Sequence, residues 1–414
     1  MSDFLGPKPL TAASIDAAIT GKITTPGSAT ATALTATYAS RAVAREARAG
    51  SRGFAFIGDS NTASGVTGSS ALLLAPVIYF ENPSWVGWAV VTGAGRYHAA
   101  AHAAEPGITP AGWVTKYLAG VIAAAPYAVV DALGTNGLTT LAAQQAALTT
   151  IYDACDNAGI KVIVCSIPPK STEGAEVARM NRWKRVIARN RGYLFVDNYA
   201  TLVDPATGTM QAAYNSDGTH FNAVGARALG IAFNTAINAV LPDVSMLALA
   251  QPAPADLVNK PLLLVKSGFV PEDWTSLGFG SASTSVDTVA GVAGKMFTVT
   301  QTAEGVNTSS AIALNADLIP GRRYRVEYKY QLTVVGTAPT AASVRLVVTT
   351  GGGTTLTSIN TQQSVPLSTV THEFVCPTLP NYNYRLNMTM NGGGVGTKQQ
   401  IGQVTITDLT AAGL

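Results

Sequence analysis

The stretch 54-FAFIGDSNTASG-65 decides the fold, because an apolar run of strand character stops abruptly at glycine, aspartate and serine. In a doubly wound α/β sheet, ligands bind at the carboxyl ends of the strands. Ser60 would therefore be exposed to a substrate, beside the backbone N–H groups of the following turn. The alternative is that Ser60 only caps a helix. A lone serine hydroxyl is a poor nucleophile, so a base must come from elsewhere in the chain.

Strand-like and helical segments alternate from about residue 53 to residue 242. The helical segments 138–159 and 175–192 each end in a glycine suited to a C-terminal cap. The strand-like segments are short and almost continuously apolar, as in a parallel sheet covered on both faces. They lie at 53–58, 127–133, 160–167 and 193–197. This alternation predicts a doubly wound α/β domain.

The proline-rich segment 249-LAQPAPADLVNKP-261 predicts a linker, and the chain beyond it has an all-β texture. There, runs of alternating polarity are separated by Gly, Thr and Asn turns, which predicts a β-sandwich of jelly-roll type. These runs lie at 324–335, 343–350, 371–377 and 383–390. We therefore expect four parts: an attachment or oligomerisation arm at 1–50, an α/β domain at 51–245, a linker at 246–260 and a sandwich at 261–414.

Composition narrows the function. The 414 residues are 47% hydrophobic and 12% charged, which is enough to build substantial cores. The net charge of +3 is slight and no block of Lys or Arg occurs, so we expect no nucleic-acid partner. The start, MSDFLGPKPL, lacks the pattern of a secretory signal. The apolar stretches 71–80 and 119–130 are short and broken by proline, so we expect no membrane insertion.

The three cysteines form no CxxC or Cys/His metal pattern. Cys155 lies in a helical segment and Cys165 in a strand-like one, so both are expected to be buried free thiols. We expect neither a disulfide framework nor a metal or other cofactor.

The segment 215-NSDGTHFNAVG-225 supplies a candidate base. Asp217 and His220 are three residues apart just before a helical pattern, a spacing that can put the carboxylate beside the imidazole within one turn. Asp217 could then accept a hydrogen bond from one ring nitrogen while the other nitrogen takes a proton from a serine. The alternative is a capping aspartate and a surface histidine.

Two weaker features could stabilise an oxyanion. Asn136, in 133-LGTNG-137 at the end of a predicted strand, would present a side-chain amide at the same sheet edge. Gly107, in 105-EPGITPAGW-113, precedes a helical run and would let a backbone N–H approach a substrate oxygen. Taken singly, each segment is also typical of an ordinary turn.

The other histidines are expected to be structural. His98 and His102 have no third metal ligand in view, and His372 is expected on the surface of a strand. Positions in the core are favoured over a sugar-stacking role for three tryptophans, Trp85, Trp88 and Trp113.

Helix 175–192 carries a run of positive charges, which predicts a solvated helix face. The residues are Arg179, Arg182, Lys184, Arg185 and Arg189. Asp131 is unusual inside an apolar strand, and could hydrogen-bond a neighbouring turn.

Taken together, Ser60, Gly107, Asn136, Asp217 and His220, with the motifs GDS and DxxH, resemble the SGNH hydrolase (GDSL esterase/lipase) superfamily. The resemblance runs from about residue 53 to residue 240. It implies a flavodoxin-like α/β/α sandwich and ester hydrolysis without a metal. It also implies that Ser60 is the nucleophile, His220 the general base and Asp217 the group that orients it. The oxyanion hole would comprise the backbone N–H groups of Ser60 and Gly107 and the side chain of Asn136.

Two departures from the family pattern bear on the oxyanion hole. The family often has Asp after the asparagine, whereas this chain has Gly137. The family's glycine often follows an Asn-containing stretch, whereas Gly107 follows Ala-Ala-Glu-Pro. Gly93 and Gly95 are therefore alternatives to Gly107, while the triad is unaffected.

The N-terminal segment 21-GKITTPGSATATALTATYASRAV-43 resembles segments of bacteriophage tail and receptor-binding proteins, which are commonly trimeric. A virion protein leaves the cell by lysis and needs no signal peptide. An esterase core joined to a β-sandwich is similar to a carbohydrate esterase with a glycan-binding or oligomerising module. We therefore expect a homotrimeric phage-tail esterase that acts outside the cell, removing acyl groups, above all acetyl, from a surface polysaccharide of a bacterial host.

Two alternatives are weighed against this expectation, and the first belongs to another class of protein. One is a receptor-binding protein whose α/β domain binds glycan without turnover, against which the intact Ser/Asp/His set argues. The other is a secreted or cytoplasmic bacterial esterase or lipase unrelated to phage. The sequence leaves open the sugar, the acyl group, the host, and whether the sandwich binds glycan or trimerises the chain.

Overall fold

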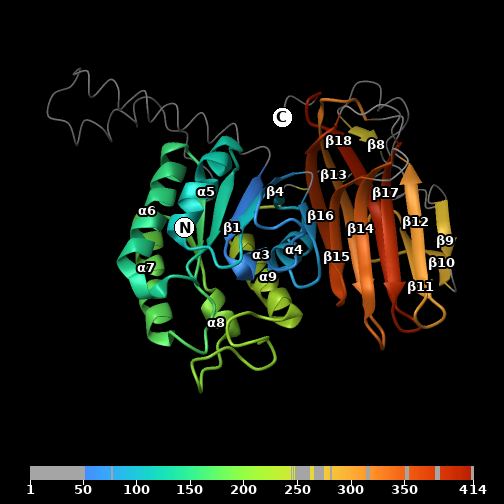
Figure 1. The fold of residues 1–414 in the computed structure, drawn as a ribbon. Coiled ribbons are helices and arrows are strands. Elements are labelled where there is room, and N and C mark those ends of the chain that lie inside the picture. The colour runs from blue at the N-terminus through green and yellow to red at the C-terminus, as the bar shows by residue number, and fades with distance from the viewer. Residues whose placement is uncertain are drawn as a thin grey trace.

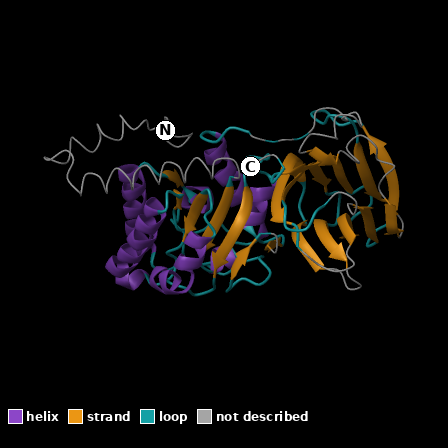
Figure 2. Ribbon diagram, turned by 90° about the horizontal axis from the view of Figure 1, so that it is seen from above, coloured by secondary structure: helices purple, strands orange, loops and turns teal. Residues whose placement is uncertain are grey.

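The computed structural model describes residues 52–75, 78–243, 245, 247, 262–264, 275–279, 282–313, 318–349, 354–377 and 383–411. They form an α/β domain and a β-sandwich that lie side by side (Figures 1 and 2). The expected arm at 1–50 lies outside the described residues, as does the expected linker at 246–260 except for residue 247. Within the described ranges, the helices are too short or too polar to cross a membrane.

The α/β domain is built on one six-stranded sheet. Its strands are β1 Gly53–Gly58, β2 Leu72–Leu74, β4 His98–Ala104, β5 Ala128–Ala132, β6 Lys161–Cys165 and β7 Leu194–Val196. They lie in the order β2-β4-β1-β5-β6-β7, and β2 alone runs antiparallel to its neighbour. Numbered in chain order, the parallel strands have the 2-1-3-4-5 arrangement of flavodoxin-like folds, in which ligands bind where the strand order reverses, beside the first strand.

Helices cover both faces of this sheet. They are α3 Ser60–Ala63, α4 Trp85–Val91, α5 Pro110–Ala123, η2 Leu138–Thr140, α6 Leu141–Asn157, α7 Gly174–Arg191, α8 Asn198–Leu202 and α9 Ala223–Asn238. Successive side chains of β1 point to opposite faces, so Phe54 and Phe56 pack with α4 and α9, and Ala55 and Ile57 with α5, α6 and α7. Figure 1 shows α6 and α7 on the outer flank and α4 and α9 on the side of the sandwich.

The expected alternation of strands and helices is confirmed. Gly159 and Gly192, which follow α6 and α7, have φ angles of 68° and 70°, in the left-handed region where glycine ends a helix at low cost. The core positions expected for three tryptophans are also confirmed, since Trp85, Trp88 and Trp113 are each no more than 1% exposed. The three cysteines, Cys155, Cys165 and Cys376, are buried and free.

The β-sandwich consists of two mostly antiparallel sheets. Their strands are β3 Ile78–Phe80, β8 Leu262–Leu264, β9 Thr275–Phe279, β10 Ala282–Asp287, β11 Met296–Gln301, β12 Asn307–Ala313, β13 Arg323–Thr333, β14 Pro339–Thr349, β15 Thr354–Thr361, β16 Val365–Val375, β17 Asn383–Gly392 and β18 Lys398–Asp408. One sheet has the order β10-β11-β18-β13-β16, with β8 beside β18, and the other β3-β15-β14-β17-β12-β9. The expected sandwich is confirmed at this level, and its jelly-roll type stays a prediction.

One strand of the sandwich comes from the α/β part of the chain. β3 pairs in parallel with β15, so that Ile78 lies opposite Thr357 and Phe80 opposite Ile359. The two domains therefore share a hydrogen-bonded sheet. Strand β16 of the other sheet packs against α4 and β4.

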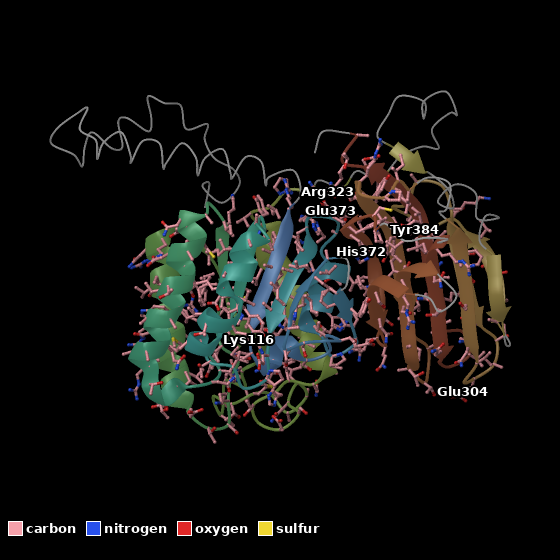
Figure 3. The ribbon with its side chains drawn as sticks, turned by 45° about the horizontal axis from the view of Figure 1, so that its top comes forward. Lys116, Glu304, Arg323, His372, Glu373 and Tyr384 are labelled. Carbon is pink, nitrogen blue, oxygen red and sulfur yellow. The ribbon has the colours of Figure 1, made fainter. Side chains whose placement is uncertain are left out.

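His372 is half-buried at the junction of the two domains and does not lie on an open strand surface as expected. Together with Ile78 and Ala99 it lines a small cavity between the domains, and burial lowers the pKa of His372 to about 3. Its position on β16, the strand nearest the α/β domain, is the reason. The neighbouring Glu373 pairs with Arg325 at 2.6 Å and also with Arg323 (Figure 3).

Candidate active site

Ser60 is the first residue of α3 and directly follows the central strand β1. Asp59 caps this helix, because its Oδ1 accepts a hydrogen bond from the Asn61 N–H at 3.2 Å. The other oxygen, Oδ2, accepts from the Thr135 N–H at 3.0 Å. Asp59 is fully buried, and this burial raises its pKa. The capping role thus belongs to Asp59, and the Ser60 hydroxyl faces the site.

The structure brings Ser60, Asp217 and His220 together. His220 Nε2 lies 2.9 Å from Ser60 Oγ, and His220 Nδ1 lies 2.7 Å from Asp217 Oδ2. A carboxylate only accepts hydrogen bonds, so Nδ1 carries the proton and Nε2 accepts from the serine. The hydrogen bond from the His220 side chain, with further ones from the backbone N–H groups of His220 and Thr219, lowers the pKa of Asp217 to about 2.

The loop that carries Asp217 and His220 depends on a glycine between them. Gly218 has a φ of 89°, and a Cβ built there would lie 2.5 Å from Ser171 Oγ. Its N–H donates to Asn215 Oδ1, and its carbonyl accepts from the Ser171 N–H at 2.8 Å. These contacts close the turn tightly enough for a carboxylate and an imidazole three residues apart to meet.

Asn136 and Gly107 lie on neighbouring loops at the carboxyl edge of the sheet. Asn136 Nδ2 donates one hydrogen bond to the Ile108 carbonyl at 3.1 Å, which ties the two loops together and leaves its second N–H for a ligand. Gly107 is exposed with a φ of 78°, and the space beside its Cα is open. Gly93 and Gly95 precede β4 and so lie at the opposite edge of the parallel sheet. They are therefore excluded as oxyanion donors, and Gly107 is retained as the candidate.

A solvent-open pocket of about 460 Å³ adjoins Ser60 and His220. Its apolar lining consists of small side chains, and its polar lining includes hydroxyls and one carboxylate. The other lining residues are Ala63, Ser64, Gly65, Val66, Thr67, Ser69, Glu81 and Pro106.

The sequence model of the GDSL-like Lipase/Acylhydrolase family matches residues 56–228, a range that contains all five candidate site residues. This range is a GDSL/SGNH hydrolase domain. Since members of this family are acylhydrolases, the match indicates an esterase or related hydrolase. No curated protein matches the chain.

Solved structures also resemble parts of the chain. A GDSL-like lipase from Bacteroides thetaiotaomicron is 18% identical, with 49% of this chain and 97% of that one covered and a TM-score of 0.36. An acetyl-xylooligosaccharide esterase mutant from Geobacillus stearmophilus is 19% identical, with 46% and 96% covered and a TM-score of 0.38. A structure described as CBM4 is 13% identical, with 33% and 96% covered and a TM-score of 0.25.

A buried ion pair supports the Asn136 loop of the hydrolase domain. Lys184 Nζ and Asp131 Oδ2 are 3.0 Å apart, and both side chains are fully buried. Lys184 also donates to the Leu133 carbonyl at 2.7 Å, while Asp131 Oδ1 accepts from the Leu133 N–H at 2.9 Å. Both backbone groups of Leu133 are thus held, three residues before Asn136.

This pair corrects one expectation and sharpens another. Lys184 is not on a solvated face, although the neighbouring Arg179 and Arg185 are mostly exposed. Asp131 does hydrogen-bond a neighbouring turn, as expected. The signal that points to such a pair is Asp131, the single charged residue of the apolar strand β5, because a buried charge needs a partner of opposite sign.

His98 and His102 take structural positions in the hydrolase domain. His102 Nε2 lies 3.1 Å from the Thr62 carbonyl in α3, and burial lowers the pKa of His102 to about 4. Burial also lowers the pKa of His98, whose Nε2 is 3.7 Å from Glu373 of the sandwich. Among the described residues, no group of three or more His, Cys, Asp or Glu side chains is arranged to hold a metal ion.

Proposed function

We propose that this protein is a serine esterase in which Ser60 is the nucleophile, His220 the general base and Asp217 the group that orients the imidazole. The observation that supports this most directly is the unbroken hydrogen-bonded series from Asp217 through His220 to Ser60, at 2.7 and 2.9 Å. In this arrangement His220 takes the Ser60 proton as the hydroxyl attacks the ester carbonyl. Asp217 stabilises the imidazolium that forms.

The proposed oxyanion hole comprises the N–H groups of Ser60 and Gly107 and the second N–H of the Asn136 amide. Donors fixed before the reaction stabilise the developing charge without reorganising, which makes this contribution a large one. His220 then protonates the leaving alcohol, and water repeats the sequence on the acyl-enzyme.

The proposed substrate is a short O-acyl ester, above all an acetyl ester, on a surface polysaccharide of a bacterial host. The pocket favours it, because hydroxyls and a carboxylate suit a hydroxylated alcohol moiety, and apolar side chains of small size suit a short acyl chain. We further propose that the protein is a homotrimeric part of a phage tail, which rests on the character of residues 21–43 in the sequence.

Hydrolysis of p-nitrophenyl esters from acetate to longer acyl chains tests the reaction, with Ser60→Ala as the control. We expect Ser60-dependent activity that is highest for acetate. No Ser60-dependent hydrolysis would favour a glycan-binding protein without turnover, and a preference for long chains would favour a lipase. Acetate release from bacterial envelope polysaccharides then identifies the substrate, and a monomer in solution would count against the tail protein.

A further inference from the structure

One wall of the catalytic pocket extends the sheet of the sandwich. Val66 forms an antiparallel bridge with Phe80 of β3, flanked by hydrogen bonds from the Glu81 N–H to the Gly65 carbonyl at 2.7 Å and from the Thr67 N–H to the Tyr79 carbonyl at 3.2 Å. Because β3 pairs in turn with β15, backbone hydrogen bonds lead from the sandwich to the pocket lining. The second domain therefore helps to fix the shape of the pocket.

Glu81 links this wall to a side chain of the sandwich. It lines the pocket that contains Ser60 and His220, and its Oε2 accepts a hydrogen bond from Asn360 Nδ2. Asn360 is 8% exposed, and its Oδ1 accepts from the Ala342 N–H at 3.0 Å. This second bond fixes which way the Asn360 amide faces, so its N–H is directed at Glu81.

Within the described part of the chain, no residue donates to the other oxygen of Glu81, Oε1. Among the described residues that line the pocket there is no Lys or Arg, so none of them offsets the carboxylate with a permanent positive charge. A carboxylate accepts hydrogen bonds from hydroxyl groups and repels other anions. The pocket thus presents a fixed acceptor beside the proposed nucleophile.

We propose that Glu81 is a specificity-determining residue that accepts hydrogen bonds from hydroxyls of the sugar carrying the ester, and that Asn360 of the sandwich positions it. The substrate class is then an O-acylated sugar with a free hydroxyl near the ester and no carboxylate of its own, rather than an acylated uronic acid. This inference rests on the proposed esterase function and narrows its substrate.

The test compares kcat/KM for three substrates: p-nitrophenyl acetate, methyl 3-O-acetyl-glucopyranoside, and methyl 3-O-acetyl-glucopyranosiduronate. A lost charge-assisted hydrogen bond corresponds to a fall of about ten-fold or more. We expect Glu81→Gln to lower kcat/KM on the neutral acetyl glycoside by about that factor, and at least five-fold more than on p-nitrophenyl acetate. In the same variant, the ratio of kcat/KM for the neutral glycoside to kcat/KM for the uronate should fall.

For Asn360→Ala we expect a smaller fall in kcat/KM on the neutral glycoside, roughly three- to ten-fold and mainly in KM, because Glu81 remains but is no longer held. Gln363→Ala is the matched control. Gln363 lies in the turn that follows β15 and also bridges the domains, donating to the Ala223 carbonyl at 3.1 Å, but no hydrogen bond joins it to Glu81. In Gln363→Ala, kcat/KM should be unchanged for all three substrates.

Equal changes on all three substrates in Glu81→Gln, or none, would overturn the inference while leaving the esterase proposal intact. If the unaltered chain hydrolyses p-nitrophenyl acetate through Ser60 but no acetyl glycoside, the carbohydrate substrate is overturned and the inference with it. If Gln363→Ala lowers kcat/KM on the neutral glycoside as much as Asn360→Ala does, both effects come from a loosened contact between the domains. That result would overturn the proposed role of Asn360.

Discussion

The two sides of Ser60 are supported by different parts of the molecule. On one side, the loop that leads to Asn136 is held by Lys184 and Asp131 in the core of the hydrolase domain. On the other side, the pocket wall at residues 65–67 is hydrogen-bonded to β3, an edge strand of the sandwich sheet. The groups proposed for the chemistry thus rest on a self-contained core, whereas the surface proposed to meet the sugar depends on the second domain.

The largest effect is expected at Ser60, which lies between the two sides. Ser60→Ala should lower turnover by roughly 10⁴- to 10⁶-fold on every ester, because the variant lacks the hydroxyl that attacks the ester carbonyl. Stability should hardly change, since Asp59 and not Ser60 caps α3. Steady-state hydrolysis and thermal unfolding measure the two quantities. Ester hydrolysis that persists in Ser60→Ala would contradict the role of Ser60 as nucleophile. The comparison of the two sides of Ser60 would then lose its basis.

The support of the Asn136 loop is tested with Lys184→Met. This change leaves Asp131 as an unpaired buried charge and should cost about 3–5 kcal/mol of unfolding free energy. The matched control is Arg179→Met on the same helix, where an exposed ion pair with Glu176 is worth about 1 kcal/mol at most. Denaturant unfolding measures the loss of unfolding free energy in both variants. Equal losses would mean that the buried pair of Lys184 and Asp131 gives the loop no special support.

Asn136→Ala removes a proposed oxyanion donor together with the hydrogen bond to the Ile108 carbonyl. Loss of one oxyanion donor should lower kcat by roughly two to three orders of magnitude, corresponding to about 2.7–4 kcal/mol, with little change in KM. The fall should be similar for p-nitrophenyl acetate and for acetyl glycosides, because the oxyanion forms in both reactions. Unaltered turnover would remove Asn136 from the site.

The dependence of the pocket wall on the sandwich is tested with Asn82→Ala. The Asn82 side chain exchanges two hydrogen bonds with Gln362 of the sandwich, at 3.3 and 3.2 Å, and is 8% exposed. Its loss should cost about 1–2 kcal/mol of unfolding free energy. It should also raise KM for acetyl glycosides more than KM for p-nitrophenyl acetate. The reverse order of KM changes would show that the junction does not govern the sugar side.

The smallest expected effect is the change in unfolding free energy that accompanies the titration of Asp217. Its folded pKa, about 2, lies below its ordinary value of 3.8, so the ionised group contributes stability above that value and loses it as the pH falls through about 2. The side chain is 54% exposed, and solvent screening should keep the contribution below about 1 kcal/mol. Asp217→Asn should therefore flatten the dependence of unfolding free energy on pH between 4 and 2. Identical pH slopes in the two proteins would contradict this.

The local parts of the site could be predicted from the sequence because their geometry is set within a few residues. A strand that ends in Gly-Asp-Ser places Ser60 at the carboxyl edge of the sheet, and the Asp217–Gly218–Thr219–His220 turn brings a carboxylate to an imidazole. The alternation of apolar strands and glycine-capped helices likewise predicts a parallel sheet, and the rules for such connections limit the strand orders that it can adopt.

The remaining features depend on contacts between distant segments. Six positive charges along one helix do not show that Lys184 turns inward, since its partner Asp131 lies on another element. Similarly, β3 is three residues long and carries no sign that it pairs with β15. His372 has the alternating context of a surface strand, and only the packing of the two domains encloses it.

The pairing of β3 with β15 has a consequence for how the protein is made. Phe80 leaves the ribosome long before its partner Ile359, because the rest of the hydrolase domain and most of the sandwich are synthesised between them. The hydrolase core can form as soon as its own strands are complete, but the pocket wall gains its outer hydrogen-bonded neighbour only when β15 has emerged. Synthesis therefore completes the catalytic loops first and the proposed sugar-binding wall last.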